Sequence, residues 1–346
     1  MTGAVWEAVG GLLGSLKQEI SAQGWDEELG RQTMRALADA GWLGVGLQEG
    51  LGGEGGDLAD VLEVVDAIGG TGWPSPVPDL LLVGNGLFAH AGVARPSTSV
   101  VVVPALGDAS AGGVTVAADG VPWAPWATHF AVVSPAGDGA ACLSIVESGH
   151  ARLRTARNLA GAPLADVRLD RAPAHSTTVA ATPADGLVGF VRDLGALSRA
   201  VLSRSALRRV QQLTVEHVRA REQFGRPLSA FQAVQQHLAA LACEVAAAEA
   251  AVDAAVRGVA TVAEFAGGPR LATARVRVAS AASEVVRLAH QLHGAIGVTR
   301  EYELHRHTLS LLAWRDEFGT QREWAAYLAE AAAASPDLWS WLLDEV

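Results

Sequence analysis

Two short segments of the sequence bring together residue types that could bind or transform a ligand. The first reads REQFGRPL from Arg221 to Leu228, and Gln232 follows it closely. The planar guanidinium of Arg221 could hold a phosphate, and the ring of Phe224 could lie against an aromatic ligand. A helix end closed by Gly225 is the simpler explanation, but it does not require an arginine, an amide and an aromatic residue together. We therefore interpret this segment as a candidate anion site beside a flat apolar surface.

The second segment reads QLHGAIGVT from Gln291 to Thr299. Gly294 and Gly297 lack a Cβ, so the backbone here could come within reach of a ligand. The amide of Gln291 could form a hydrogen bond with the edge of a ring or with a phosphate. A turn between two helices would explain the glycines alone. Because both segments occur in this order in one chain, we expect them to serve one binding function.

The composition excludes several classes of protein. The chain has 346 residues, of which 50% are hydrophobic and 18% are charged, so it can bury a sizeable core. Acidic residues outnumber basic ones 37 to 26, and the net charge of −11 disfavours a nucleic-acid partner. No apolar run reaches the ~20 residues that a bilayer-spanning helix needs, so no membrane partner is expected.

The cysteines and histidines do not suggest a disulfide framework or a metal centre. Cys142 and Cys243 are too few for either, and they fit a reducing, cytoplasmic location. His290 and His293 have the spacing of a helical metal pair, but no carboxylate cluster accompanies them. We therefore expect no metal.

Three zones of different periodicity must position the two segments. Residues 1–94 are predicted to form a helical domain, in which Asp57 opens a helix with apolar residues at steps of three and four. Residues 95–183 contain the Val-rich runs VVVPAL, VTVAADG, HFAVVS, ACLSIV and DVRLD, which predict a small β-domain, partly sandwich or barrel. Residues 184–346 are predicted to form an antiparallel bundle of about four long helices. This order argues against a doubly wound α/β sheet.

Beyond these patterns, the chain resembles the acyl-CoA dehydrogenases, flavoproteins that oxidise an acyl-CoA to the 2,3-enoyl-CoA. The two segments are similar to that family's motifs R-x-Q-F-G-R-P-L…F-Q and Q-x-H-G-G-x-G, with Ala295 replacing the second glycine. The stretch GWLGVGLQEGLGGEGGD, residues 41–57, is similar to the family segment GW-x-G…PE-x-GG-x-G. The resemblance covers nearly the whole chain, and it implies an N-terminal α-helical domain, a small middle β-domain and a C-terminal four-helix bundle.

The resemblance implies that FAD is bound in an extended form between subunits. The positions of Arg221 and Gln232 match contacts to the flavin nucleotide, and the stretch from Gln291 to Ala295 matches the loop that a neighbouring subunit presents to the same FAD. Asp193 matches a position that contacts the pantetheine of CoA, and Arg199 lies nearby in the sequence. The implied residues are Arg221, Gln223, Phe224, Gln232, Gln291, Leu292, His293, Gly294, Ala295 and Thr320 for the cofactor, and Asp193 and Arg199 for the substrate.

The reaction of this family also needs a base. The α-proton of a thioester is weakly acidic, so a positioned carboxylate must remove it while the β-hydrogen leaves as hydride to the flavin. The resemblance places the usual base at Phe318, one residue after Glu317, and the alternative base of some members at Gly195. One residue is about 100° of rotation on a helix, so Glu317 would need a locally shifted turn to act. Glu317 is the candidate catalytic residue of this chain.

The β-domain also departs from the family pattern. The segment T-E-P-x-x-G-S-D, which meets the flavin ring in the family, is missing, and Trp123, Trp126 and Thr128 lie in the only similar hydrophobic stretch. In these gaps the chain resembles a reduced subunit of the mixed pairs that some bacterial members form, including members acting on steroid side-chain acyl-CoAs. In such pairs one chain type keeps the base, and the other supplies part of the FAD site.

The resemblance therefore implies FAD-dependent dehydrogenation of an acyl-CoA, or of a carrier-bound acyl thioester, within lipid metabolism. The implied partners are an electron-transfer flavoprotein or another acceptor, and either further copies of this chain in a homodimer or homotetramer or a second acyl-CoA dehydrogenase-like chain. The alternative is a repurposed fold that binds an acyl group or a flavin for a non-oxidising reaction, or a non-catalytic partner subunit. A scaffold without a cofactor would not need Arg221, Phe224, Gln232 and Gln291.

Overall fold

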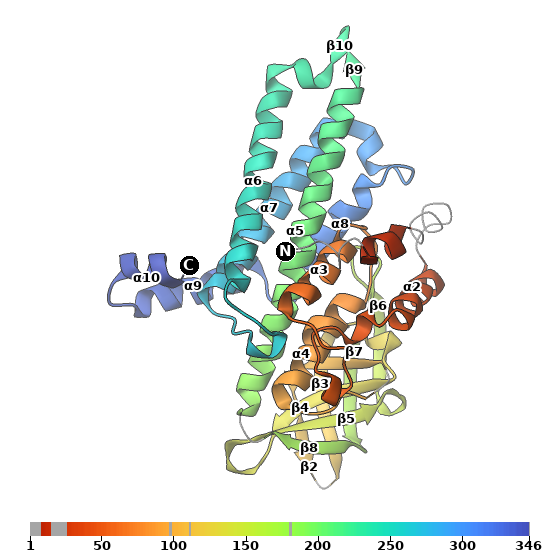
Figure 1. Ribbon diagram of the computed structural model, residues 1–346, viewed down its shortest axis with the longest axis vertical. Coiled ribbons are helices and arrows are strands. Elements are labelled where there is room, and N and C mark those ends of the chain that lie inside the picture. Colours follow the sequence, from red (N-terminus) through yellow and green to blue (C-terminus); the bar gives the residue numbers. More distant parts are fainter. Residues whose placement is uncertain (1–7, 15–25, 97–98, 111, 180–181, 346) are drawn as a thin grey trace.

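The computed structural model describes residues 8–14, 26–96, 99–110, 112–179 and 182–345, and it arranges them as helices, then strands, then helices (Figure 1). This is the order that the sequence predicts. A short helix covers residues 8–14. The helical elements that follow it before the strands are α2 (Glu27–Asp39), the 3-10 turns η1 (Trp42–Gly44) and η2 (Glu49–Leu51), α3 (Leu58–Gly69), the π-helical turn η3 (Asp79–Gly84) and α4 (Asn85–Ala91).

Capping side chains explain where the early helices begin. The carboxylate of Asp26 accepts a hydrogen bond from the backbone N–H of Leu29 at 2.9 Å and so caps α2. Asp57 and Asp60 form a reciprocal capping box at the start of α3. The apolar residues after Asp57 face inward, which confirms the predicted helix; they include Leu58, Val61, Val65 and Ile68.

The β-domain is a sandwich of two four-stranded sheets, one of the two predicted alternatives. One sheet has the order β1-β4-β5-β8 with β1 and β4 parallel, and the other has the antiparallel order β2-β3-β7-β6. The strands are β1 (Val100–Leu106), β2 (Asp108–Ser110), β3 (Gly113–Pro122), β4 (His129–Pro135), β5 (Ala141–Glu147), β6 (Arg152–Arg157), β7 (Pro163–Ala172) and β8 (His175–Val179). Phe130 and Val132 of one sheet share a buried cluster with Val116 and Val167 of the other.

Strand β4 of the first sheet is buried on both faces. Alternate residues of a strand point to opposite faces, so Phe130 and Val132 face the second sheet, whereas Ala131 and Val133 join the core shared with the helices. The run HFAVVS is therefore almost continuously apolar. The sequence predicts β1, β3, β4, β5 and β7 from such runs but not β2, β6 and β8, whose residues are mostly exposed.

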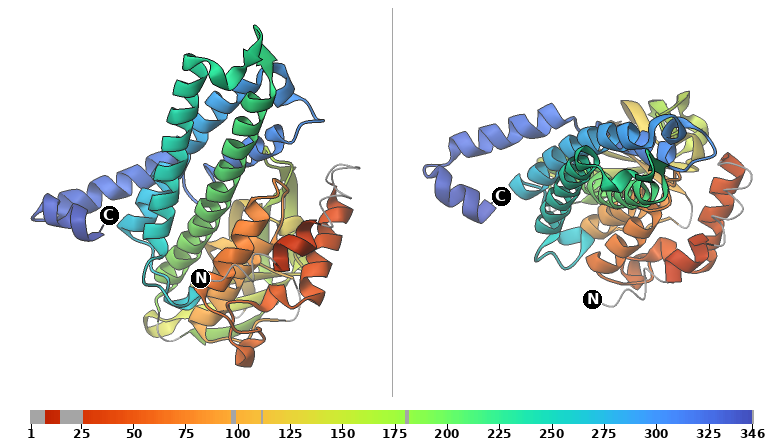
Figure 2. Two further views of the ribbon diagram at one scale, coloured as in Figure 1. Left: turned by 45° about the horizontal axis from the view of Figure 1, so that its top comes forward. Right: turned by 90° about the horizontal axis from the view of Figure 1, so that it is seen from above.

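Helix α5 (Ala184–Ala220) runs along most of the molecule and connects its parts (Figures 1 and 2). Its 37 residues span about 55 Å, and they pack against α3 and α4, against β1 and β4, and against three helices that follow α5 in the chain. The remaining helices are α6 (Gln232–Val256), α7 (Pro269–His293), α8 (Leu304–Trp314), α9 (Gln321–Ala334) and α10 (Leu338–Glu345). None of the helices in the described ranges is long and apolar enough to cross a bilayer.

The close approach of α3 to α5 depends on Gly69. A Cβ at this position would lie 2.9 Å from the carbonyl oxygen of Leu202 and 3.0 Å from Cβ of Ser205. We expect Gly69→Ala to lower the free energy of unfolding by about 1–3 kcal/mol, because the added methyl group forces the helices apart. Urea denaturation measures this difference. Gly70→Ala is the matched control, since its Cβ would come no closer than 3.5 Å to a neighbour, and an equal loss in both variants would contradict the packing argument.

Candidate functional site

Arg199 of α5 lies buried where the helical domain, the β-domain and the bundle meet. Its Nη1 and Nη2 donate to Oδ1 and Oδ2 of Asp79 at 2.5 and 2.9 Å, and its Nε donates to Oε2 of Glu317 at 2.5 Å. The Arg199 side chain is only 3% exposed. Burial alone would lower the pKa of Arg199, but the charges of Asp79 and Glu317 outweigh it and raise the pKa above its ordinary value. The guanidinium is therefore charged and fixed in orientation.

Both carboxylate oxygens of Glu317, the candidate base, already face protein donors. Oε2 accepts from Arg199, and Oε1 accepts from the side-chain amide of Asn158 at 2.9 Å. Asn158 follows β6, whereas Glu317 lies in the turn between α8 and α9. A base must come within hydrogen-bond distance of the proton that it removes. In this structure the Glu317 carboxylate instead connects the β-domain to the bundle.

Arg275 of α7 fixes the turn that carries Glu317. Its Nη2 lies 2.8–3.2 Å from four carbonyl oxygens, which belong to Trp314, Arg315, Glu317 and Gly319. They include carbonyls at the end of α8, which lack partners within the helix. Burial lowers the pKa of Arg275 to about 10, so the side chain stays protonated at neutral pH. The backbone of this turn is thus held in one conformation.

The side chain of Phe318 packs directly onto Gly195 of α5. Its backbone φ of +55° is uncommon for a bulky residue. A Cβ on Gly195 would lie 2.2 Å from Cδ1 of the ring, and Cζ of Arg199 is 5.0 Å from the ring centroid. The family resemblance places a base at one of these two positions. Neither residue carries a carboxylate, and the Phe318 ring fills the space above Gly195.

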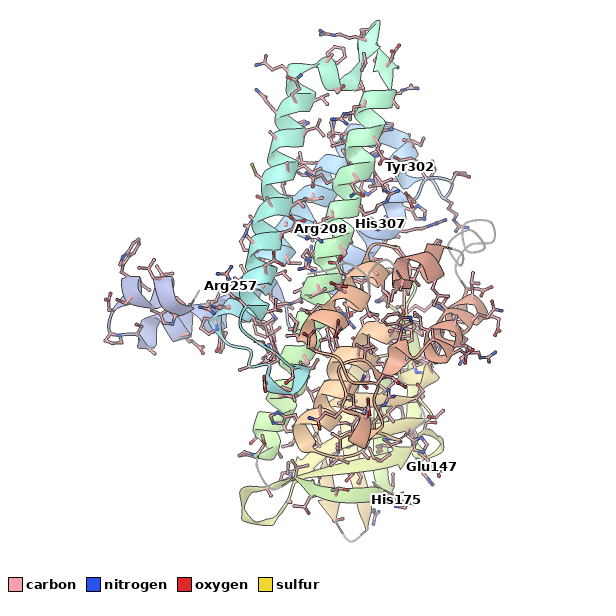
Figure 3. All side chains as sticks on the ribbon, in the orientation of Figure 1. Glu147, His175, Arg208, Arg257, Tyr302 and His307 are labelled. Carbon is pink, nitrogen blue, oxygen red and sulfur yellow. The ribbon has the colours of Figure 1, made fainter. Side chains whose placement is uncertain are left out.

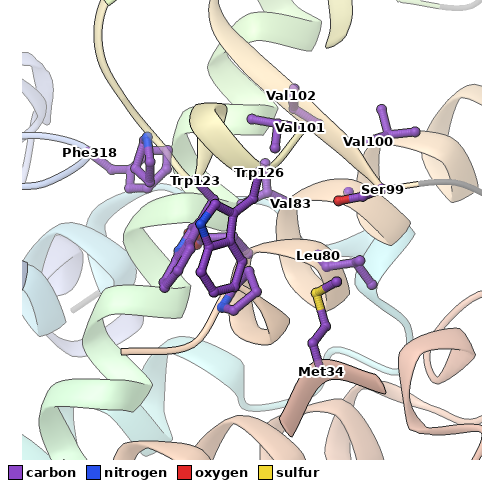
Figure 4. A pocket seen from close by; sticks show the side chains of 14 residues that line it. Met34, Leu80, Val83, Ser99, Val100, Val101, Val102, Trp123, Trp126 and Phe318 are labelled. Atoms are coloured by element: carbon purple, nitrogen blue, oxygen red, sulfur yellow. The ribbon is translucent and has the colours of Figure 1, made fainter. Parts of the chain in front are cut away.

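The cavity beside Phe318 is narrow and apolar (Figure 4). Its volume is about 40 Å³, room for a few water molecules, whereas ligand pockets commonly measure about 300–1,000 Å³. Trp123 and Trp126 line it, and their rings pack edge to face with centroids 5.1 Å apart. Trp123 also has a positive φ of 61°. Two buried indoles thus occupy the stretch that replaces the family's flavin-ring segment.

The first group of predicted cofactor residues lies at the far end of the bundle (Figure 1). Arg221 follows α5, and a small hairpin of β9 (Glu222–Gln223) and β10 (Arg226–Pro227) carries Gln223 and Phe224. All are exposed, as is Gln232 at the start of α6, and the Phe224 side chain reaches 92% exposure. Among the described residues the Arg221 side chain has no ion-pair partner. This end of the bundle therefore exposes hydrogen-bond donors and an aromatic ring to solvent.

The second group, residues 291–295, ends α7 near the same end of the bundle. Leu292 and His293 are buried, while Gln291, Gly294 and Ala295 are exposed. Nδ1 of His293 lies 2.8 Å from the carbonyl oxygen of Ala289 and so carries the proton, and Nε2 lies 3.3 Å from the hydroxyl of Tyr302. Tyr302 is labelled in Figure 3. Burial lowers the pKa of His293 to about 4, so the ring is neutral at pH 7. His290 contacts Thr308 instead, at 3.0 Å, and does not pair with His293.

The remaining predicted residues take part in local structure. The hydroxyl of Thr320 caps α9 by accepting from the backbone N–H of Glu323. The carboxyl group of Asp193 accepts from the N–H of Gly267, where a Cβ would lie 2.0 Å from Oδ2. Burial raises the pKa of Asp193 to about 6, although the charge of Arg192 and this hydrogen bond act against the shift. The carboxyl group of Asp193 is therefore held in one position, in space that Gly267 leaves free because it lacks a Cβ.

Three residues of this site are absent from the sequence-based prediction. Arg275 had a detectable signal, because it falls in line with Leu271 and Val278 on the apolar face of its helix, where a charged residue needs buried partners. Asp79 and Asn158 had no such signal in the sequence. They lie 120 and 159 residues from their partners, Arg199 and Glu317.

Comparison with known proteins agrees with the motifs. The family model for the acyl-CoA dehydrogenase C-terminal domain matches residues 193–324. Acyl-CoA dehydrogenase IpdE2 of Mycobacterium tuberculosis is 31% identical over 285 residues, which cover 82% of this chain and 80% of that protein. The 3-sulfinopropanoyl-CoA desulfinase of Paraburkholderia xenovorans is 35% identical over 94 residues, covering 27% of this chain and 24% of that protein. The crystal structure of the ChsE4-ChsE5 complex from Mycobacterium tuberculosis matches with a TM-score of 0.82 and 23% identity, over 97% of this chain and 99% of that chain.

The raised pKa of Asp193 predicts a pH-dependent cost to stability. An unfolded aspartate titrates near pH 3.9, so between there and pH 6 the folded chain binds more protons at this site and stability falls as pH rises. We expect Asp193→Asn to gain stability relative to the wild type between pH 4 and pH 7, by up to about 3 kcal/mol. Urea denaturation across this range measures the gain, with Asp39→Asn on exposed helix α2 as the control. Parallel profiles for Asp193→Asn and the wild type would contradict the prediction.

Proposed function

The chain belongs to the acyl-CoA dehydrogenase family, and we propose that it acts there as one subunit of a mixed pair, contributing part of a FAD site while a second chain of the same family supplies the base. The pair would dehydrogenate an acyl-CoA or a carrier-bound acyl thioester to the 2,3-enoyl thioester. The contact between Phe318 and Gly195 carries this proposal, because it leaves no carboxylate at either base position. The free thiols of Cys142 and Cys243 fit a cytoplasmic location.

The ion pairing of Glu317 supports a base on the second chain. A general base gains and loses a proton in every turnover, and its charge changes each time. Protonation of Glu317 would remove one of the two carboxylates that compensate the buried Arg199. The uncompensated charge would oppose proton transfer. Glu317 is therefore better suited to a constant structural charge than to a catalytic cycle.

The residues of this chain fit one end of FAD and not the other. The exposed Arg221, Gln232 and Phe224 could hold the pyrophosphate and cover an aromatic ring, and the exposed backbone at Gly294 could approach the nucleotide. The isoalloxazine ring needs a slot much larger than the cavity of about 40 Å³ beside Trp123 and Trp126. Within the described residues, this cavity is therefore too small to hold the flavin ring.

Within the proposed pair the chemistry divides between the two chains. Bound FAD would supply the hydride acceptor for the β-hydrogen, and a carboxylate of the second chain would take the α-proton. The partner that reoxidises the pair would be an electron-transfer flavoprotein or another acceptor. Arg221, Gln223, Phe224 and Gln232 would hold the nucleotide end and exclude water from it. A structural relative described as a complex of two differently named chains is consistent with such a division.

A repurposed fold is the second candidate function. The similarity to a desulfinase over about a quarter of the chain favours it, because that name describes a reaction other than dehydrogenation. In this case the chain would bind an acyl group or a flavin without removing hydrogen. A chain that purifies without flavin, without a second chain and without FAD affinity would support this candidate over the mixed pair.

The role of Glu317 can be tested by exchange of the α-proton. We expect Glu317→Gln in the assembled pair to change the rate of α-proton exchange of an acyl-CoA by less than about twofold. We also expect the free energy of unfolding to fall by about 1–3 kcal/mol, because Arg199 loses a charged hydrogen-bond partner. Deuterium exchange followed by mass spectrometry measures the rate, and Glu330→Gln on α9 is the control for stability. Loss of exchange in folded Glu317→Gln would assign the base to this residue.

The role of Arg221 can be tested by FAD titration. We expect Arg221→Ala to weaken FAD binding to the flavin-free pair by about tenfold or more, since a charge-assisted hydrogen bond contributes about 1.5–3 kcal/mol. Flavin fluorescence measures the affinity. Arg219→Ala is the matched control, because Arg219 is also exposed and lies only two residues earlier. Equal affinities in the two variants would count against the phosphate contact, and one FAD per copy of this chain alone would overturn the mixed pair.

A further inference from the structure

A cleft of about 1080 Å³ lies outside the site described above. Its walls come from the start of α2, the turn after α3, the turn after β6, and one face formed by α7, the 3-10 turn η9 (Gly294–Val298) and α8. The volume is at the upper end of the range for small-molecule sites, about 300–1,000 Å³. The cleft can therefore enclose a ligand that the narrow cavity beside Phe318 cannot.

One wall of the cleft is apolar and open to solvent. Val286 of α7 and Leu309 and Leu312 of α8 line it, together with Val298 and Pro74. Val298 is 68% exposed and Leu309 is 38% exposed, so both present hydrocarbon to water in this chain. Burial of this surface by the apolar part of a ligand would remove hydrocarbon from water and is therefore favourable.

Three positively charged residues also line this cleft, namely Arg157, Arg300 and Arg306. Arg157 forms an ion pair with Glu27, which also accepts a hydrogen bond from Nε1 of Trp126 at 3.3 Å. No ion pair of Arg300 or Arg306 occurs in the described part of the chain. Arg300 and Arg306 thus place two cations in one cleft of a protein with a net charge of −11.

The ring of Trp73 lies beneath one of these cations. The guanidinium of Arg306 lies over the ring with Cζ 3.9 Å from the centroid. The indole itself is buried, so it supports Arg306 from below. The cleft thus combines an apolar wall with two cations.

The acidic residues of the cleft limit the charge of its ligand. Asp26 and Glu27 also line it, and both are engaged, since Asp26 caps α2 and Glu27 pairs with Arg157. Their negative charges would repel a dianionic phosphate more strongly than a monoanion. A carboxylate matches the planar fork of an arginine and carries a single charge.

We propose that this cleft binds an amphiphilic carboxylate, with its apolar body against the Leu309 wall and its head group between Arg300 and Arg306. The site is separate from the thioester chemistry. The cavity next to it, which shares Trp73 and Pro74, measures only about 20 Å³ and is lined by Arg199 and Glu317. Neither Arg199, Glu317 nor Phe318 lines the cleft itself, so the proposal does not depend on the function proposed above.

Calorimetric titration of the full chain with three matched probes tests the proposal. Octanoate combines a tail with a carboxylate, octanol has the tail alone, and acetate has the carboxylate alone. We expect octanoate to bind at least about tenfold more tightly than either of the others, because both walls contribute. Equal affinities for octanoate and octanol, or no octanoate binding, would overturn the proposal.

Substitutions locate the binding in the cleft. We expect Arg300→Ala to weaken octanoate binding about tenfold and to leave octanol unchanged, whereas Leu309→Asp weakens both. Arg322→Ala, at an exposed position of α9 outside the cleft, is the control and should match the wild type. Thermal unfolding checks that each variant is folded, with Leu309→Ser replacing Leu309→Asp if the latter is not. Unchanged octanoate affinity in folded Arg300→Ala would place the binding elsewhere and overturn the proposal.

Discussion

One buried guanidinium joins the three zones of this chain. Transfer of Arg199 from water to the interior is costly, and only carboxylates at close range offset that cost. Asp79 comes from the helical domain and Glu317 from the bundle, while Asn158 of the β-domain holds the second oxygen of Glu317. Because breaking a buried pair typically costs about 3–5 kcal/mol, the relative positions of the three zones are tied to this one cluster.

The same cluster determines what the neighbouring residues can do. The ion pair of Glu317 with Arg199 and the carbonyl contacts of Arg275 together fix the turn after α8. Phe318 has a positive φ in this turn. The ring then packs on Gly195 and closes the cavity that Trp123 and Trp126 line. A carboxylate that neutralises a buried arginine must stay charged, whereas a general base must gain and lose a proton. The contacts of Glu317 suit the first of these roles.

Local patterns in the sequence predicted the elements whose residues are buried. The helix after Asp57 and strands such as β4 were found because their apolar residues follow the period of the structure. Strands β6 and β8 were missed because they are largely exposed and have no such pattern. Counting along the motifs identified Gly195 and Phe318 as the two base positions. Only the folded chain reveals that the Phe318 ring fills the space above Gly195. That contact depends on a backbone conformation that phenylalanine does not favour locally.

The two ends of the bundle differ in a way that favours assembly over independent action. Around Arg199 the interior is closed, charged and filled with side chains, whereas the far end exposes Arg221, Gln232 and the nearly bare ring of Phe224. An exposed aromatic ring beside a cation gains its stabilisation only when another surface covers it. Among the described residues, neither base position carries a carboxylate, and the cavity beside Phe318 is too small for a planar flavin ring. A chain of the same family that kept both features would complement this one in the proposed mixed pair.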